Sequence, residues 1–265
     1  MSSLPRFFVP PALLTADEVT LPTEAAHHAR TVLRLRVGEE ALVHDGAGGG
    51  ARVALTEVGP KAVQARVVER FAVHTEPRLR ITVAQALPKT ADKVDQVLQH
   101  GTEVGAAGFL FFPAQRSVAR LEGRDKVERR VERWRAIVQG AAEQSGRGVL
   151  PTVEWLTGGE ALAERLSGCG ASLTLHESAG TPLRVALSTP PAAAAADLCL
   201  VVGPEGGLTE AEVVRFAAAG AAAVSLGPRV LRTETAALVA LAQILYAREA
   251  DADVDAHDAP GSAAV

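Results

Sequence analysis

The chain has 265 residues, of which 48% are hydrophobic and 22% charged, a composition typical of a globular protein rather than a disordered one. Its two cysteines, Cys169 and Cys199, form no CxxC pair, which excludes a disulfide scaffold and a zinc ribbon. The formal net charge is −4, but residues 73–150 are net +4, while residues 151–250 are net −4 and the last fifteen residues hold four Asp and no Lys or Arg. Because a basic stretch remains, the total charge does not exclude a nucleic-acid partner.

The start of the chain shows no pattern of export. Residues 1–14 hold three prolines and lack a basic segment followed by an apolar core, so they are not typical of a signal peptide. The most apolar helical stretch, residues 236–247, is too short to span a bilayer. We therefore expect a cytoplasmic protein with no membrane partner.

The first 72 residues alternate short apolar segments with turn residues, which predicts a small, mostly β module. Residues 24–35 have helical spacing. Strands are expected at 40–44, 52–58 and 63–68. The glycine-rich residues 46–50 connect two of these strands and no helix follows them, so we interpret them as a hairpin loop and not as a nucleotide-binding fingerprint.

From residue 73 onward, strand patterns alternate with helix patterns. Strands are predicted at 79–86, 109–112, 172–175, 198–202 and 222–226, and helices at 90–104, 123–145, 209–219 and 235–247. This alternation favours an α/β domain with a largely parallel sheet over residues 73–250. Residues 251–265 show no periodicity and are expected to form an acidic disordered tail.

Two Gly-Pro loops follow predicted strands and precede predicted helices. The first, GPEGGLT at 203–209, leads into a helix at which Thr209 and Glu212 have the spacing of a capping box. The second is GPRVLRTET at 227–235. Ligands of open α/β sheets bind at the carboxyl ends of strands, and glycines let the backbone approach them closely. The alternative is that both loops are ordinary tight turns, with Arg232 paired to Glu234.

Other candidate residues are more ambiguous. His176 follows the predicted strand 172–175, where a lone histidine is more often a packed core residue than a catalyst. Residues 116–135 hold eight basic and four acidic side chains, which fits either a solvated helix face with i,i+4 pairs or a surface for RNA phosphates. Arg30, Arg34 and Arg36 form a smaller basic cluster, with Arg6 near the start of the chain.

A series of motifs spans roughly residues 4–248. They are PRFF at 5–8, His28 with RTVLR at 30–34, Asp45-Gly46, Lys89, Lys93, EVG at 103–105, Arg116-Ser117, EQSGR at 143–147, VGPEGGL at 202–208 and LGPRVLRTET at 226–235. In this order they resemble the ribosomal small-subunit RNA methyltransferase E family, and the last two motifs are long and specific.

The resemblance implies an N-terminal PUA-like β-barrel domain joined to a SPOUT-type α/β domain whose chain forms a trefoil knot near its carboxyl end. It also implies a homodimer that binds S-adenosylmethionine, uses no metal, and methylates N3 of a uridine in the 16S rRNA of the 30S subunit. The domains would be residues 1–72 and 73–250, followed by the tail at 251–265. Two alternatives stay open: a SPOUT ribose 2′-O-methyltransferase, and a non-catalytic RNA-binding protein that has kept the fold.

The resemblance also implies roles for individual residues. Because the family varies at 175–177, backbone contacts are expected there rather than side-chain roles. Arg232 or Arg6 would stabilise the developing oxyanion of uridine, and Glu205 and Glu234 would be either proton acceptors or structural residues. The cofactor-binding residues would be Leu175, His176, Glu177, Val202, Gly203, Pro204, Glu205, Gly206, Leu226, Gly227, Pro228, Val230, Leu231 and Thr233; the RNA-binding residues would be Arg6, Arg30, Arg34, Arg36, Arg116 and Arg147; and the catalytic residues would be Arg232, Glu205 and Glu234.

Overall fold

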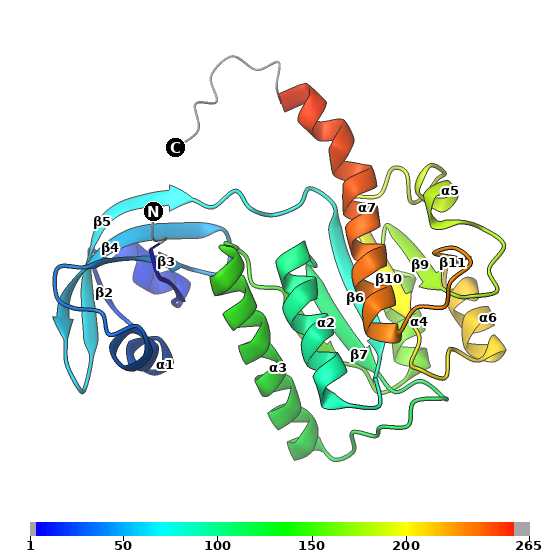
Figure 1. Ribbon diagram of the computed structural model, residues 1–265, viewed down its shortest axis with the longest axis horizontal. Helices are drawn as coiled ribbons and strands as arrows, with labels where there is room; N and C mark the ends of the chain where they lie inside the picture. The colour runs from blue at the N-terminus through cyan, green and yellow to red at the C-terminus, as the bar shows by residue number, and fades with distance from the viewer. Residues whose placement is uncertain (1–3, 257–265) are drawn as a thin grey trace. The chain divides into compact units, whose positions relative to one another are not determined.

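The computed structural model describes residues 4–256 (Figure 1). It divides into two compact units, in agreement with the change of hydrophobic pattern after residue 72. The first unit contains the chain up to Glu76 together with Gln139–Leu150, and the second contains Pro77–Val138 and the chain from Pro151 onward. The first unit is therefore discontinuous in sequence, unlike the module expected over 1–72, because the end of a long helix packs within it.

The first unit is built on a five-stranded sheet in the order β1-β3-β4-β5-β2. The strands are β1 (Arg6–Phe8), β2 (Glu18–Thr20), β3 (Glu40–His44), β4 (Gly49–Val58) and β5 (Val63–Ala72), accompanied by a 3-10 turn at Pro11–Thr15 and helix α1 (Thr23–His27). The antiparallel β3-β4-β5 meander confirms the predicted hairpins. The sequence pattern missed β1 and β2, because three residues are too few to show a period.

Alternate residues of the long strands form the core of this unit. Val43, Val53 and Ala65 are fully buried, as expected for strands with one face inward. The helix expected over 24–35 is shorter than predicted: α1 ends at His27, a π-helical turn covers His28–Val32, and Arg34 then adopts a φ of 55°. A positive φ is incompatible with helix continuation, which explains the difference.

The second unit contains a six-stranded sheet in the order β11-β9-β10-β6-β7-β8, and all five strand pairs are parallel. The strands are β6 (Arg80–Ala86), β7 (Gly108–Phe112), β8 (Thr152–Trp155), β9 (Ala171–Leu175), β10 (Asp197–Val202) and β11 (Ala221–Val224). The helices are α2 (Ala91–Val104), α3 (Arg124–Ser145), α4 (Gly159–Leu166), α5 (Leu183–Leu187), α6 (Glu210–Ala218) and α7 (Thr233–Ala256). The predicted α/β domain with a parallel sheet is confirmed.

Both faces of this sheet are covered, so its central strands are apolar throughout. In β10, Leu198 and Leu200 belong to one core, shared with α2 and α7, whereas Cys199 and Val201 belong to another, shared with α4 and α6. Figure 1 shows α2 and α7 side by side on one face of the sheet. Burial on both faces is the usual state of parallel strands and explains the unbroken LCLVV run of β10.

Two differences from the sequence prediction concern the second unit. Helix α7 continues to Ala256, so the segment expected to be disordered from residue 251 begins as helix; residues 257–265 lie outside the described part. The short elements β8, α4 and α5 were not predicted. No helix among residues 4–256 combines the length and the apolar character needed to cross a membrane.

Candidate active site

The order of the strands brings three loops to one edge of the sheet. Strands β9, β10 and β11 are neighbours and run parallel, so the segments that follow them emerge at the same edge. Together these segments line a cavity of about 530 Å³ within the second unit, a size in the roughly 300–1,000 Å³ range of small-molecule sites. The two Gly-Pro loops thus line one cavity together, and residues 175–177 form its third side.

The loop between β10 and α6 is held rigidly at its helical end. The hydroxyl of Thr209 accepts a hydrogen bond from the Glu212 amide, and the Glu212 carboxylate accepts one from the Thr209 amide at 2.8 Å, which confirms the predicted capping box. The same buried carboxylate accepts a hydrogen bond from the Gln115 amide at 2.8 Å. Gly207 has a φ of 70°, a conformation that favours glycine in this turn.

The loop between β11 and α7 is hydrogen-bonded to the first loop. The Thr233 hydroxyl donates to the carbonyl oxygen of Gly203 at 2.5 Å, and it accepts a hydrogen bond from the buried Gln85 side-chain amide at 2.8 Å. Gln85 lies on β6, so this contact fastens both loops to the centre of the sheet. Because Thr233 and Gln85 are buried, loss of either partner would leave a polar group unsatisfied.

A lysine and two carboxylates form the charged part of the site. Lys93 Nζ on α2 lies 2.9 Å from Glu205 Oε1, and the Lys89 amide donates to both oxygens of the same carboxylate at 3.1 Å. Burial opposes the ionisation of Glu205, but the hydrogen bonds from Lys93 and from the backbone outweigh it, so the pKa of Glu205 is lowered. The Lys93 ammonium gains the hydrogen bond to Glu205, which raises the pKa of Lys93.

Glu234 is placed differently from Glu205. Its carboxylate Oε2 lies 3.5 Å from Lys93 Nζ, and the residue is buried behind the loop. It is not among the residues that line the cavity, whereas its neighbours Arg232 and Thr233 are. Its position therefore favours a structural role at the start of α7 over direct contact with a ligand.

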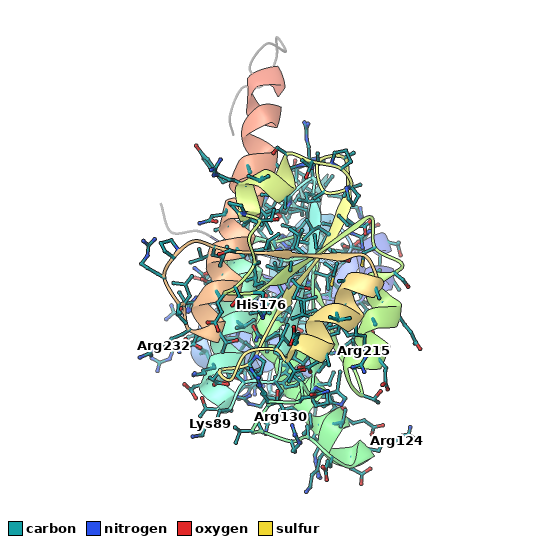
Figure 2. All side chains as sticks on the ribbon, turned by 90° about the vertical axis from the view of Figure 1, so that its right-hand side faces the viewer. Lys89, Arg124, Arg130, His176, Arg215 and Arg232 are labelled. Atoms are coloured by element: carbon teal, nitrogen blue, oxygen red, sulfur yellow. The ribbon has the colours of Figure 1, made fainter. Side chains whose placement is uncertain are left out.

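Arginine side chains lie around the cavity. Arg116 lines it and donates to the carbonyl oxygen of Gly206 at 3.1 Å, while Arg229 and Arg232 line it from the β11–α7 loop and are exposed. In Figure 2, His176 lies near the centre of this face, with Lys89, Arg130, Arg215 and Arg232 around it in the view. The charged side chains that line the cavity are mostly basic, which suits an anionic partner; they are Lys93, Arg116, Arg229 and Arg232, against Glu177 and Glu205.

The structure brings most of the predicted cofactor residues to this cavity. Pro228 is the exception among them, since it does not line the cavity, although its neighbours do. The predicted cofactor residues that line it are Leu175, His176, Glu177, Val202, Gly203, Pro204, Glu205, Gly206, Leu226, Gly227, Val230, Leu231 and Thr233. The position of these residues agrees with the expectation, while their binding role stays a prediction.

The predicted RNA-binding arginines fall into two groups. Arg34 and Arg36 are exposed, and Arg30 is partly buried, with its guanidinium donating to the carbonyl oxygens of Gly59 at 3.1 Å and Pro60 at 2.8 Å.

The expectation for Arg147 requires correction: it is 4% exposed and forms an ion pair with Glu76 inside the first unit. A guanidinium buried in this way serves the packing of the unit rather than contact with RNA.

The remaining predicted RNA-binding residues are more accessible. Arg6 is half-buried at the start of β1 in the first unit, where it lies against Gly146. Arg116, in the second unit, is exposed and reaches the cavity as described above.

Sequence reasoning missed Gln85, which holds the two loops together, and it named Lys93, which lines the cavity, only as part of a motif and without a role. Lys89 precedes the predicted helix 90–104 and Lys93 lies in its first turn, so both lysines are near the start of that helix. Gln85 could have been noticed as a polar residue in an otherwise apolar strand, because such residues are buried only with a partner.

The described residues contain no cluster of three or more His, Cys, Asp or Glu side chains that could hold a metal ion.

Matches to known protein families identify the class of this protein. Residues 75–245 match the family model of the RNA methyltransferase domain, and residues 21–68 match that of the RNA methyltransferase PUA domain. The chain is 39% identical over 244 residues to the Ribosomal RNA small subunit methyltransferase E of Mycobacterium bovis, and the alignment covers 90% of each chain.

Two solved structures extend the comparison. That of a Ribosomal RNA small subunit methyltransferase E from Neisseria gonorrhoeae bound to S-adenosyl methionine has a TM-score of 0.80 at 30% identity, covering 91% of this chain and 97% of that one. A methyltransferase from Legionella pneumophila with bound cofactor SAM has a TM-score of 0.83 at 30% identity, covering 93% and 98%. The chain belongs to the ribosomal RNA small subunit methyltransferase E family, as its motifs predicted.

Proposed function

We propose that this protein methylates N3 of a uridine in the 16S rRNA of the small ribosomal subunit, with S-adenosylmethionine as the methyl donor. One observation carries the proposal beyond family membership: loops from three adjacent parallel strands line one cavity, and the Thr233 hydroxyl joins two of them. The two SAM-bound relatives support the choice of cofactor.

The lining of the cavity is suited to this cofactor. A Cβ atom at Gly206 would lie 3.2 Å from Arg116 Cβ, and one at Gly203 would lie 3.1 Å from the Leu208 amide nitrogen, so glycine allows the loop to pack closely against these residues of the lining. The carboxylates of Glu177 and Glu205 are acceptors suited to hydroxyl or ammonium groups. The cofactor would be held by residues 175–177, 202–206 and 226–233, with its reactive group supplying a methyl on a sulfonium centre.

Arg232 is the residue we assign to transition-state stabilisation. Uridine N3 carries a weakly acidic proton, and its loss places negative charge on the neighbouring carbonyl oxygens. A guanidinium is charged at any ordinary pH and cannot serve as the base, but its planar donors can hold such an oxyanion. Arg232 lines the cavity and is exposed, so it can reach a base that enters from outside.

The two carboxylates have different roles in this proposal. Glu205 already accepts hydrogen bonds from Lys93 and from the Lys89 amide, and its lowered pKa makes it a weak base, so it organises the loop that holds the cofactor. Glu234 lies outside the lining of the cavity. The N3 proton is then taken up by solvent at the mouth of the cavity, and positioning of the two reactants supplies much of the rate.

RNA recognition is assigned to basic residues of both units. In the first unit these are Arg6, Arg30, Arg34 and Arg36, and in the second unit Arg116 with the basic segment 116–135. N3 lies on the Watson–Crick edge, so a paired uridine must be unpaired and turned outward before it can react. Phosphate contacts by these arginines would help to hold the RNA during that step.

We further propose a SPOUT-type trefoil knot in the second unit, a homodimer, and a cytoplasmic location. Resemblance to the family supports the knot and the dimer. In the sheet, β10 lies between β9, which precedes it in sequence, and β6. This strand order is compatible with a chain that passes through its own loop. Sedimentation of the purified protein would test the dimer.

The decisive experiment is methylation of 30S subunits from a strain that lacks the modification, followed by nuclease digestion and mass spectrometry of the 16S rRNA. A single N3-methylated uridine is the expected product. Methylation of a ribose 2′-oxygen would instead support the first alternative activity. No methylation, together with no binding of S-adenosylmethionine in calorimetry, would support an RNA-binding protein without catalysis.

A further inference from the structure

The two cysteines of the chain meet within the second unit, outside the cavity. Cys199 lies on β10 and is fully buried, whereas Cys169 lies in the turn between α4 and β9 and is partly exposed. The two thiols are joined by a hydrogen bond, and neither residue lines the cavity. Because the chain holds no other cysteine, this contact brings all of its thiol groups together.

Backbone contacts hold the exposed thiol against the strand. The amide of Gly170 donates to the Asp197 carboxylate at 2.8 Å, so the residue after Cys169 is fastened to the first residue of β10. The amide of Cys169 donates to the carbonyl oxygen of Leu166 at 3.1 Å, at the end of α4. Cys169 also packs against the core cluster to which Cys199 belongs. The pairing of the two thiols is therefore set by the fold around them.

The two thiols differ in acidity. The hydrogen bond with Cys199 lowers the pKa of Cys169 to about 7, against the opposing effects of burial and of the Asp197 charge; Ser172 and the Arg165 charge lower it further. On ionisation Cys169 gives up its hydrogen bond to the Arg165 carbonyl oxygen, at 3.3 Å. The same thiol contact, together with burial, raises the pKa of Cys199. At neutral pH the pair thus combines an accessible thiolate with a buried thiol.

This combination is typical of cysteines that undergo reversible oxidation. Such cysteines are accessible, have a low pKa and lie next to a second thiol that can resolve a sulfenic acid. A free cysteine can also serve as a small apolar residue of a core. That role accounts for Cys199 alone, but it does not require a second thiol in contact with it on the exposed side.

We propose that Cys169 and Cys199 form a redox modification site that reacts with peroxides. The Cys169 thiolate attacks one peroxide oxygen and the O–O bond breaks. The leaving alkoxide or hydroxide takes up a proton, and a sulfenic acid is left on Cys169. The Cys199 sulfur then attacks the Cys169 sulfur, so that the S–S bond forms, the S–O bond breaks, and the Cys199 proton leaves with the hydroxide as water. Overall, two electrons pass from the two sulfur atoms to the peroxide.

The turn before β9 can supply the movement that the disulfide needs. Disulfide sulfurs are about 2.05 Å apart, closer than two hydrogen-bonded thiols. Cys199 is held inside the sheet, since β10 lies between β9 and β6. Gly168 precedes Cys169 on the exposed side, and a Cβ atom placed there would meet no atom closer than 3.7 Å. The turn can therefore approach β10 while the loops that line the cavity stay in place.

Peroxide treatment of the reduced full-length protein, followed by tryptic digestion and mass spectrometry, tests this site. Trypsin cleaves after Arg165, Arg184 and Arg215, so the two cysteines fall in separate peptides, 166–184 and 185–215. We expect one equivalent of hydrogen peroxide to join these peptides in a chain that keeps its monomer mass on a denaturing gel. Dithiothreitol should separate them again.

Two variants assign the roles of the thiols. In Cys199→Ala the sulfenic acid has no resolving partner, so dimedone should label Cys169, and iodoacetamide should alkylate it about tenfold more slowly at pH 7 than in the wild type, because an ordinary thiol has a pKa near 8.5. Cys169→Ser is the matched control, in which the buried Cys199 should stay reduced. The Tm of each variant checks folding, and the wild-type peptides decide the outcome even if Cys199→Ala does not fold.

Three results would overturn the proposal. The first is a wild-type protein that keeps both thiols free under peroxide, with Cys169 alkylated no faster than free cysteine. The second is a disulfide found only between two chains. The third is oxidation of Cys199 in Cys169→Ser as fast as in the wild type. None of these results bears on methyl transfer, so this proposal and the proposed function are tested separately.

Discussion

Lys93 Nζ lies 2.9 Å from Glu205 Oε1 and 3.5 Å from Glu234 Oε2, so one ammonium group contacts carboxylates of two different segments at the cavity, the β10–α6 loop and the start of α7. Glu205 belongs to the β10–α6 loop, and Glu234 is the second residue of α7. The lysine side chain is only 22% exposed, which makes this contact stronger than an ion pair on an open surface. Helix α2 thereby helps to set the distance between the two loops.

Replacement of this lysine should loosen the cavity. Lys93→Met leaves two carboxylates without their shared cation, and we expect the Kd for S-adenosylmethionine to rise about tenfold in calorimetry, with a larger effect on KM for the cofactor than on kcat. Lys93→Arg should recover part of the affinity. Arg165→Gln removes an exposed ion pair to Glu154 away from the cavity and serves as the control. Equal affinities of Lys93→Met and the wild type would show that the loops do not depend on this contact.

The same pair predicts a pH dependence of stability. Because the pKa of Glu205 is lowered from its ordinary value of 4.5, its contribution is present above that value and is lost as the pH falls through the folded-state pKa. The pKa of Lys93 is raised from 10.5, so its contribution is present below that value and is lost as the pH rises through the folded-state pKa. Between these limits the pair is charged and intact.

Urea unfolding of the wild type and Glu205→Gln at several pH values would measure this effect. The free energy of unfolding should be higher for the wild type at neutral pH, and the difference should shrink as the pH falls below about 4.5, where the unfolded carboxyl group begins to take up its proton. A difference that stays constant down to the most acidic conditions would contradict the ionic origin of the contact.

Arg232 should act mainly on the chemical step. We expect Arg232→Ala to lower kcat about a hundredfold on 30S subunits, because removal of one preorganised donor to a developing oxyanion has an effect of that size. Arg232→Lys should recover only part of the loss, since an ammonium lacks the planar pair of donors. Arg229→Ala, from the same loop and also exposed, is the matched control and should keep most of kcat. Equal losses in both alanine variants would point to the charge of the loop rather than to the position of Arg232.

Arg147 is predicted to matter for stability and not for RNA affinity. Its guanidinium is paired with Glu76, and the His44 ring contacts its backbone carbonyl at 3.1 Å. Arg147→Met leaves the Glu76 carboxylate without its cationic partner. We expect the free energy of unfolding to fall by about 3 kcal/mol, the lower end of the destabilisation seen when one partner of a buried ion pair is removed. Below its Tm the variant should bind 30S subunits as the wild type does. A double variant with Glu76→Leu should regain part of the lost stability, measured by urea unfolding.

Long elements were predictable because their patterns repeat. The capping box at Thr209 and the apolar run of β10 were identified in the sequence and are present in the structure. The three-residue strands β1 and β2 were not predicted, since a period of two needs more residues to be visible. The helix expected over 24–35 failed for a different reason: Arg34 has a positive φ, and the next residue, Leu35, packs against the core of the first unit, so tertiary packing overrides the helical preference of the segment.

The burial and the ion-pair partners of individual charged residues were less predictable than the helices and strands. Arg34 and Arg147 are the same residue type and carry the same family expectation, yet one is exposed on a strained turn and the other is buried against Glu76. Nothing local in the sequence distinguishes them, because the partner of Arg147 lies 71 residues away. The contact of Lys93 with Glu205 was unpredictable for a similar reason, since the two residues are 112 positions apart in the chain.

The sequence by itself determined the alternation of strands and helices, the helix cap at Thr209, the two Gly-Pro loops and, through its motifs, the family. These features depend on local spacing and on residue types, which a sequence displays directly. Only the tertiary structure decided that β9, β10 and β11 lie side by side, that the two loops share the Thr233–Gly203 hydrogen bond, and that Lys93 lies between two carboxylates. Strands that are apolar on both faces carry no mark of their order in the sheet, and the cavity exists because of that order.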